Sequence, residues 1–323
     1  MDQFLETLWV LALVALLIYV AVYVPITMAR TRDRHPYGWL LISLLLSPPI
    51  AIIGLMMLGR ATPREPDLME KDNADWPIFV ISLPDRLDRR AAITAQLTAH
   101  DLPFEIIDAI DGRSGLTEAQ KSAVDHAAVQ RYLGRPLSDT EIACAQSHQS
   151  VYQRVITLDL GGAVILEDDA TLTTAFATLY RARAYQRFDI LQFSYRRARV
   201  FPSRWLWPHL TKDIRAARVL LNSEFASTYS VNQRAARYLS HGPKPIGGPA
   251  DWPRDTFGLR HIVTVPQTAD QNGDTLSSDI EFGRVDLASR VNKDRSFRRL
   301  LRLQYWKVWL RKRLSRKLAW ERI

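Results

Sequence analysis

An uncharged apolar run near the amino terminus, from Leu8 to Met28, constrains this chain more than any other feature. Its length matches the roughly 20 helical residues that cross the hydrocarbon core of a bilayer. Within lipid every backbone N–H and C=O group must be paired inside the protein, so a spanning segment of this kind must be helical. We therefore expect a membrane helix, followed by a separate domain in the remaining chain.

A second apolar run extends from Tyr37 to Leu58 and contains Pro48 and Pro49. Two adjacent prolines remove backbone donors, so this segment should kink or break there. The first run is longer than the apolar part of a signal peptide and lacks a basic segment before it, which favours a membrane anchor. We predict a transmembrane two-helix hairpin over residues 1–60. The alternative is one span followed by a monotopic or re-entrant segment.

The charges that flank the second run leave its orientation open. Three cations precede it and three follow it, whereas the chain before the first run has no Lys or Arg. These cations are Arg30, Arg32, Arg34, Arg60, Arg64 and Lys71. Because the positive-inside rule compares such counts, the tie does not decide which side the following domain occupies.

The positive charge of the chain is concentrated at its carboxyl end. Residues 290–323 hold 13 Lys and Arg against two acidic residues, in a chain whose total net charge is +9. The chain before residue 290 carries no excess of positive charge, so we expect no nucleic-acid partner. Apolar residues recur at three- or four-residue steps in the tail, at Leu300, Leu303, Trp306, Leu310 and Leu314, and the aliphatic stem of Lys317 falls on the next step. This pattern predicts a basic amphipathic helix within residues 286–323 that lies on an anionic membrane surface. A helix packed on the domain and a disordered basic end are the alternatives.

Between these ends, a polar linker at residues 61–75 leads into a domain predicted for residues 76–285. Apolar strand-like segments alternate with helical ones, and the capping boxes Thr117 with Gln120 and Ser138 with Glu141 mark two helix starts. This alternation predicts an α/β fold with a mostly parallel central sheet. The single cysteine, Cys144, excludes an internal disulfide and a zinc cage built from several cysteines.

An acidic triplet, Glu167-Asp168-Asp169, directly follows the apolar segment Val164-Ile165-Leu166. Carboxylates at the end of a buried strand lie at the sheet edge where open α/β folds bind ligands. Oxygen ligands of this kind suit Mg²⁺ or Mn²⁺, and a metal there can take up charge on a departing nucleotide diphosphate. A solvated acidic turn that caps the next helix is the alternative.

Three weaker features accompany the triplet. The segment Asp85-Arg86-Leu87-Asp88-Arg89-Arg90 offers arginines that suit phosphate oxygens, although it also fits a charged helix start. His148 shares a predicted helix with Cys144 and Ser147, where a hydrogen-bonded structural histidine is the simpler interpretation. Asp251 follows Gly247-Gly248-Pro249 on a loop, either as a general base or as a turn former.

Four of these segments, in this order, resemble glycosyltransferase family 25, which contains lipooligosaccharide galactosyl- and glucosyltransferases. They are Ile78–Leu83 with Arg86 and Arg89-Arg90, Phe104–Gly112, Glu141–His148 and Leu166–Asp169. A weaker fifth match runs from Ser227 to Asp251. Ser82 replaces a usual asparagine, Thr140 and Ala143 replace usual glycines, and Tyr195 to Val219 is unmatched, which leaves acceptor choice open.

The resemblance implies a GT-A-like fold, a nucleotide-sugar donor, a divalent metal (Mn²⁺ or Mg²⁺) and inverting transfer of a hexose. On this basis Asp168 and Asp169 hold the metal, and Asp251 is the expected base. His148 is expected to support the site. The expected donor-binding residues are Arg86, Arg89, Asp111, Gly112 and Glu167.

The expected acceptor is a glycolipid or envelope glycan such as lipopolysaccharide. The expected location is the bacterial inner membrane, with the catalytic domain in the cytoplasm, where nucleotide sugars are made. Two other functions remain open: a catalytically inactive module that keeps the fold to bind a glycan or partner, and a structural membrane protein whose apolar hairpin is its working part.

Overall fold

The computed structural model describes residues 2–32, 34–58, 75–271 and 303–319. Contacts between Cα atoms divide the chain into two compact units. The first comprises Met1–Glu65 with Leu300–Leu310, and the second comprises Pro66–Arg299 with Arg311–Ile323. Each unit is described by itself.

The amino-terminal unit begins with a continuous helix. It consists of α1 (Asp2–Ile18), a π-helical turn η1 (Tyr19–Tyr23) and α2 (Val24–Arg30). The segment Gln3–Arg30 has a mean hydropathy of 2.5 over its most apolar window, and no residue of that window is buried within the protein. It is thus long and apolar enough to cross a membrane, and its position near the amino terminus also suits a signal sequence.

The second apolar run is divided, as its prolines predicted. It forms α3 (Pro36–Leu45) and α4 (Pro48–Leu58), and α4 begins at the first proline of the pair. Ser43 of α3 donates a 2.7 Å hydrogen bond to the carbonyl oxygen of Ala21, which ties α3 to the first helix. Among the described residues, one helix is therefore long enough to span a bilayer, and a hairpin of two full spans is not established.

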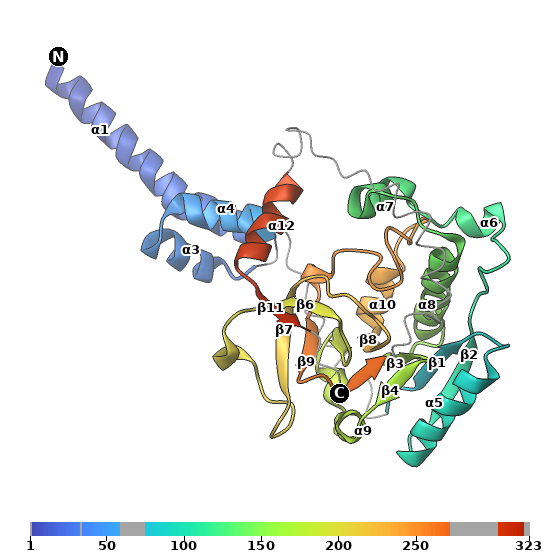
Figure 1. Ribbon diagram of the computed structural model, residues 1–323. Helices are drawn as coiled ribbons and strands as arrows, with labels where there is room; N and C mark the ends of the chain where they lie inside the picture. The colour runs from blue at the N-terminus through green and yellow to red at the C-terminus, as the bar shows by residue number, and fades with distance from the viewer. Residues whose placement is uncertain (1, 33, 59–74, 272–302, 320–323) are drawn as a thin grey trace. The chain divides into compact units, whose positions relative to one another are not determined.

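The second unit is built on a nine-stranded sheet of order β11-β6-β7-β9-β5-β8-β3-β1-β2 (Figure 1). Its strands are β1 (Ile78–Ser82), β2 (Phe104–Asp108), β3 (Gly162–Glu167), β5 (Ile190–Gln192), β6 (Arg197–Val200), β7 (Arg215–Leu221), β8 (Thr228–Asn232), β9 (His261–Val265) and β11 (Arg316–Ala319). A separate antiparallel pair joins β4 (Ala170–Leu172) to β10 (Ala269–Gln271).

The sheet is mixed rather than mostly parallel. Strand β1 pairs in parallel with β2 and β3, and β5 pairs in parallel with β9. The remaining neighbours are antiparallel. The prediction of parallel strands thus holds where helices connect successive strands, at the β2-β1-β3 end. Beyond β3 most pairings are antiparallel, beginning with β8, which lies antiparallel between β3 and β5, and β5 with β9 is the parallel exception among the described strands.

Helices cover both faces of this sheet. The bounds are α5 (Leu87–Ala99), α6 (Glu118–Lys121), α7 (His126–Leu133), α8 (Asp139–Thr157), α9 (Thr174–Arg181) and α10 (Gln233–Leu239), with short 3₁₀ turns η3 (Ala184–Arg187), η4 (Arg204–Leu206) and η5 (Thr256–Gly258). One apolar core packs α5 and α9 against the sheet, and a second packs α8 and α10 against its other face. Successive residues of β3 alternate between them: Val164 and Leu166 join the first, Ala163 and Ile165 the second.

Both predicted capping boxes are confirmed. Thr117 and Gln120 cap α6, and Ser138 and Glu141 cap α8. Glu141 is also buried and forms a two-pronged ion pair with Arg135, at 2.7 and 2.8 Å. These contacts stabilise the amino-terminal turn of α8, the helix that carries His148.

The predicted carboxyl-terminal helix is wrong in its extent. Helix α12 covers Leu303–Arg313, and the chain then forms β11, which pairs with β6 at the sheet edge. Lys317 therefore belongs to a strand, where its expected helical spacing has no meaning. The part of the predicted helix before Leu303 lies outside the described residues, and membrane binding by this tail stays a prediction.

A buried histidine in the core gives the stability of this unit a pH dependence. Burial lowers the pKa of His261 to about 3, and the charge of Arg218 lowers it further. Its ring contacts Thr256 (2.8 Å) and Gln192 (3.2 Å). Below the ordinary pKa of 6.5, His261 takes up a proton in the unfolded chain but not in the folded protein. The free energy of unfolding therefore decreases as the pH is lowered below 6.5. At pH 5 this loss is about 2 kcal/mol.

We expect His261→Gln to remove the part of the pH dependence of stability that His261 causes. The variant is less stable than the wild type at pH 7.5, but the difference in the free energy of unfolding narrows by about 2 kcal/mol at pH 5. Urea denaturation followed by tryptophan fluorescence measures it. His241→Gln, which changes an exposed histidine, is the control. A wild-type-to-His261→Gln difference that stays constant with pH would contradict the prediction.

Candidate functional site

The candidate site lies where three parallel strands end. In the β2-β1-β3 register, Ser82 is opposite Asp108 and Ile81 is opposite Glu167. Parallel strands place their carboxyl ends at one edge, so the basic turn after β1, the segment after β2 and the acidic triplet after β3 meet there. Arg90 fixes this edge by donating to the carbonyl oxygen of Ser82 (2.9 Å) and to Asp108 (2.5 Å).

The three acidic side chains of the triplet have different surroundings. Glu167 continues the strand and contacts His148 of α8, whereas Asp168 is directed toward α5. Asp168 is buried, and it accepts hydrogen bonds from Ser82 (2.6 Å, to Oδ2) and Arg89 (3.4 Å, to Oδ1). Both carboxylate oxygens of Asp168 are therefore engaged by the protein, which fits an anchor between β3 and α5.

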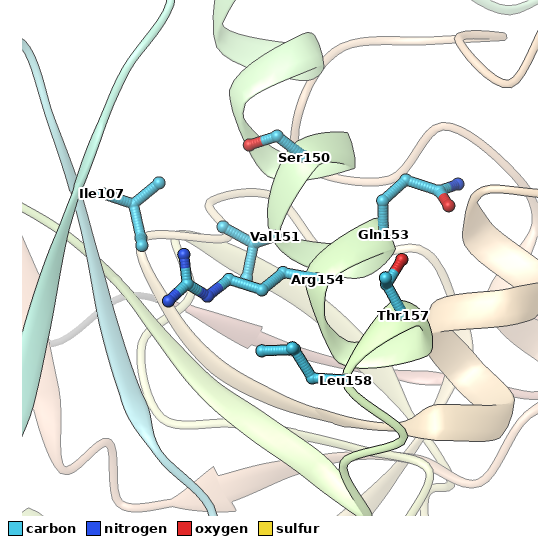
Figure 2. Close-up of a pocket in the computed structure, with 7 residues that line it drawn as sticks. All are labelled: Ile107, Ser150, Val151, Gln153, Arg154, Thr157 and Leu158. Carbon is cyan, nitrogen blue, oxygen red and sulfur yellow. The ribbon is translucent and has the colours of Figure 1, made fainter.

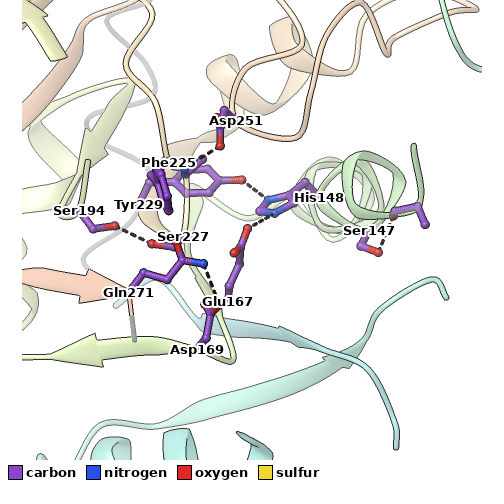
Figure 3. A network of polar contacts seen from close by, with 12 residues as sticks. Ser147, His148, Glu167, Asp169, Ser194, Phe225, Ser227, Tyr229, Asp251 and Gln271 are labelled. Carbon is purple, nitrogen blue, oxygen red and sulfur yellow. Dashed lines mark hydrogen bonds and ion pairs between the residues drawn. The ribbon is translucent and has the colours of Figure 1, made fainter. Parts of the chain in front are cut away.

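Asp169 has the surroundings of a cation ligand. Its Oδ2 accepts a 2.7 Å hydrogen bond from the Gln271 amide, seen in Figure 3. Its Oδ1 and the Oε1 of Gln271 are both buried and accept no hydrogen bond from the described part of the chain. Burial raises the pKa of Asp169 to about 7, and the charge of Glu167 adds to the increase. Two unsatisfied buried oxygens beside a second carboxylate are costly unless a cation is shared among them.

Gln271 was missed in the sequence analysis. It lies about 100 residues after Asp169, and only the antiparallel pairing of β10 with β4 brings it alongside, opposite Ala170. No local pattern in the sequence marks a glutamine for this position. The structure therefore places a neutral side-chain amide beside the carboxylates that the sequence predicted.

His148 lies in a buried hydrogen-bond chain (Figure 3). Its Nδ1 is 2.7 Å from the Tyr229 hydroxyl, which is 2.7 Å from the Tyr152 hydroxyl, and its Nε2 is 3.2 Å from Glu167 Oε1. Burial lowers the pKa of His148 to about 4, so the ring is neutral at physiological pH. A neutral imidazole with one nitrogen bonded to a tyrosine can fix the orientation of Glu167, and the supporting role of His148 stays a prediction.

The two predicted donor-binding turns lie side by side. Arg113 bridges them, because its guanidinium donates to Asp111 (2.7 Å) and to Asp85 (2.8 Å). Hydrogen bonds from Arg113 lower the pKa of Asp111 to about 2, and the charge of Arg86 lowers it further. The structure thus brings Arg86, Asp111 and Gly112 together, with Arg113 as a member that the sequence analysis did not identify.

Gly112 is required by a close approach to α8. A Cβ atom at this position would lie 2.5 Å from the carbonyl oxygen of Asp139 and 2.8 Å from the Cβ of Ala143. Neither atom belongs to the end of a flexible side chain, so a methyl group would push the Asp111-Gly112 turn away from the helix.

We expect Gly112→Ala to destabilise the protein by about 1–3 kcal/mol, as overpacking in a close contact does. The midpoint of urea denaturation measures this loss. Gly258→Ala is a matched control, because a Cβ there meets nothing within 4 Å. Equal stability of the two variants would show that the Gly112 contact is not a constraint.

Asp251 reaches the same region from the loop before η5. Its Oδ1 accepts a 3.1 Å hydrogen bond from the backbone N–H of Ala226, just before β8. Its charge acts on His148 and on Tyr152, which places it close to the buried chain of Tyr152, Tyr229 and His148. The predicted base is thus near this buried chain, and its contact with Ala226 is one that an asparagine can also make.

Comparison with known proteins identifies the family of this chain. The model of the family described as glycosyltransferase family 25 (LPS biosynthesis protein) matches residues 75–252, which is more than half of the chain. The chain belongs to glycosyltransferase family 25. All the predicted site residues, from Arg86 to Asp251, lie within the matched segment, whereas Gln271 lies beyond it.

Curated relatives share part of this family-25 segment. A probable inactive glycosyltransferase 25 family member 3 of Rattus norvegicus is 31% identical over 121 residues, covering 35% of this chain and 20% of its own. Procollagen galactosyltransferase 2 of Homo sapiens is 33% identical over 118 residues, covering 35% and 18%. Procollagen galactosyltransferase 1 of Danio rerio is 29% identical over 118 residues, covering 35% and 19%. The matched segment thus spans about a fifth of the length of these relatives.

A surface depression of about 480 Å³ lies elsewhere on the family-25 domain (Figure 2). The carboxyl-terminal half of α8, the residue that follows this helix and one residue of β2 line it. These residues are Ile107, Ser150, Val151, Gln153, Arg154, Thr157 and Leu158. None of the predicted site residues is among them, so we do not assign the depression to the chemistry at the strand ends.

Proposed function

We propose that this family-25 protein transfers a hexose from a nucleotide-sugar donor to a glycan acceptor. The observation that carries the proposal is a pair of buried oxygens, on Asp169 and Gln271, that accept no hydrogen bond from the described residues and lie beside Glu167 at the carboxyl edge of the sheet. The remainder of the site supports it, because the arginine-containing turns after β1 and β2 adjoin the same edge. A GT-A-like arrangement of these elements is part of the proposal.

Each residue of the site has a separate proposed role. Asp169, Gln271 and Glu167 would hold a divalent cation such as Mn²⁺ or Mg²⁺, which supplies charge neutralisation at the donor diphosphate. Asp168 is assigned to anchoring through Ser82 and Arg89 rather than to the metal, in contrast to its predicted role. Arg86 and the Asp111-Gly112 turn bind the nucleotide.

Asp251 is proposed as the general base. A carboxylate there takes the proton from the acceptor hydroxyl as that oxygen attacks the sugar, which inverts the configuration at the anomeric carbon. His148 acts through Glu167, whose carboxylate it orients, and is therefore a positioning residue.

The names of two relatives, as procollagen galactosyltransferases, support a hexose and particularly galactose as the sugar. The family description supports an envelope glycan such as lipopolysaccharide as the acceptor. We further propose that the apolar helix Gln3–Arg30 anchors the protein in a bacterial inner membrane with this domain in the cytoplasm, where the donor is available.

A second candidate is a glycan- or donor-binding protein without activity. It is favoured by one observation, which is that the Rattus norvegicus relative is named as probably inactive. The two candidates share the fold and the donor site, and differ in turnover.

Donor binding by the purified full chain is the first test. Titration calorimetry with a panel of nucleotide sugars, in Mn²⁺ and then in excess chelator, is expected to reveal one or two preferred donors whose affinity depends on the metal. Arg86→Ala should weaken these donors, since it removes a phosphate-binding guanidinium. Absence of binding by every donor in the panel would count against both candidates.

A further inference from the structure

A second cluster of ligating side chains lies beside the acidic triplet. Cys144 and His148 are one helical turn apart on α8, so they share a face of that helix, and Glu167 approaches them from the end of β3. One ligand atom from each of these three residues lies within 4.8 Å of the other two. We infer that Cys144, His148 and Glu167 form a binding site for a thiophilic divalent cation, with Zn²⁺ as the best match.

The distances suit tetrahedral coordination. Bonds of 2.0–2.3 Å place neighbouring ligand atoms of a zinc ion about 3.3–3.6 Å apart. His148 Nε2 and Glu167 Oε1 are 3.2 Å apart, which is close to this spacing. Cys144 completes the set after a small side-chain adjustment, because all three ligand atoms already lie within 4.8 Å.

Two tyrosines orient the His148 ring through hydrogen bonds on its Nδ1 side. Tyr229 holds Nδ1 at 2.7 Å, and Tyr152 holds the Tyr229 hydroxyl at 2.7 Å, so Nε2 is the nitrogen presented to Glu167. A hydrogen bond to the second ring nitrogen is the usual support of a histidine that ligates a metal. His148 is 1% exposed, whereas Cys144 and Glu167 are partly exposed, which leaves a route for an ion from solvent.

Charge and ligand type separate this cluster from the proposed catalytic cation. Binding releases the thiol proton of Cys144 to solvent, and the thiolate and the Glu167 carboxylate then balance the two charges of the ion. Sulfur and imidazole ligands favour zinc, whereas the oxygens of Asp169 and Gln271 favour Mg²⁺ or Mn²⁺. Three protein ligands leave a fourth position for water or another ligand.

Glu167 belongs to both sets of ligands, so zinc in this site would withdraw it from the donor site. This consequence rests on the proposed function, but the binding of zinc does not. The site would make transfer sensitive to free zinc, through the one cysteine of the chain.

Cobalt substitution tests the site without any activity assay. Co²⁺ bound by a thiolate gives a near-ultraviolet charge-transfer band, and the band can come only from Cys144 because the chain has no other cysteine. We expect this band to appear when the full chain is titrated with Co²⁺ and to saturate at one ion per chain. Addition of Zn²⁺ should displace the Co²⁺ and abolish the band.

The variants separate this site from its neighbours. Cys144→Ser should lose the band, and circular dichroism checks that this variant is folded. If it is not, alkylation of Cys144 in the folded wild type serves the same purpose. Asp169→Asn should keep the band, so a failure of the proposed catalytic cation would not affect the result. Tyr229→Phe should keep the band and lower the affinity for Co²⁺ by about 10- to 100-fold.

Three results would overturn the inference. The first is the absence of a band in the wild type. The second is saturation at one ion per two chains, which would mean that two molecules share the metal through their cysteines. The third is an affinity for Co²⁺ that neither His148→Gln nor Glu167→Gln changes. That result would mean that the Cys144 thiolate alone binds the ion.

Discussion

Replacement of Asp169 by asparagine is expected to lower the rate of sugar transfer by about 10²–10³-fold, or about 3–4 kcal/mol in transition-state stabilisation. The substitution keeps the shape of the side chain and an oxygen that can accept from Gln271, but it removes the charge that would hold a cation. Initial rates at saturating donor, with Mn²⁺ added, measure this loss. Excess chelator should reduce the wild-type rate to a similar extent.

Asp168→Asn provides the comparison for this prediction. Its two oxygens are engaged by Ser82 and Arg89, so we expect this variant to lose stability rather than metal dependence. Undiminished transfer by Asp169→Asn, or by the wild type in chelator, would exclude the assignment of the cation to Asp169.

Asp251→Asn is expected to lower transfer by about 10²–10⁴-fold, the usual contribution of a general base. Asparagine can still accept the hydrogen bond from the Ala226 N–H, so the loop keeps its contact. Donor affinity, measured by titration calorimetry, should therefore stay close to that of the wild type. Asp251→Ala, which loses both the charge and the contact, distinguishes loop anchoring from proton removal.

If Asp251→Asn loses donor binding together with transfer, Asp251 belongs to the donor site or to folding. If transfer is unchanged, another group accepts the proton. In either case the proposed role of Asp251 is wrong, whereas the assignment of Asp169 is unaffected.

Local signals in the sequence predicted the elements that carry the site. The capping boxes at Thr117 and Ser138 predicted two helix starts, and the apolar segment before Glu167 predicted β3. These signals succeed because hydrogen bonding at a helix start and burial of a short strand depend on neighbouring residues. The family resemblance then supplied the grouping of the site residues.

The contacts that depend on distant pairing could not be predicted in this way. Gln271 joins Asp169 only through the pairing of β10 with β4, and Tyr229 meets His148 only because β8 inserts antiparallel between β3 and β5. The prediction of one long carboxyl-terminal helix failed for a related reason. The helical spacing of the tail continues past Arg313, but pairing with β6 makes the last described segment a strand.

The end of strand β3 also changed the assignment of the triplet. Three consecutive carboxylates look equivalent in the sequence, yet only Glu167 belongs to β3, whereas Asp168 and Asp169 lie in the turn that follows it. Glu167 contacts His148 of α8, and Asp168 is engaged by Ser82 and by Arg89 of α5. The choice between Asp168 and Asp169 as the cation ligand required these contacts.

Release of nucleoside diphosphate tests most directly whether this family-25 protein is an active transferase. The purified full chain is incubated with its preferred nucleotide sugar, Mn²⁺ and an extract of envelope glycolipids, and nucleoside diphosphate is quantified alongside the mass of the glycolipid product. The account predicts stoichiometric release and a mass increase of one hexose, both lost in Asp169→Asn. A wild-type chain that binds the donor but releases no nucleoside diphosphate with any acceptor would contradict it, and would identify a binding protein that has kept the fold.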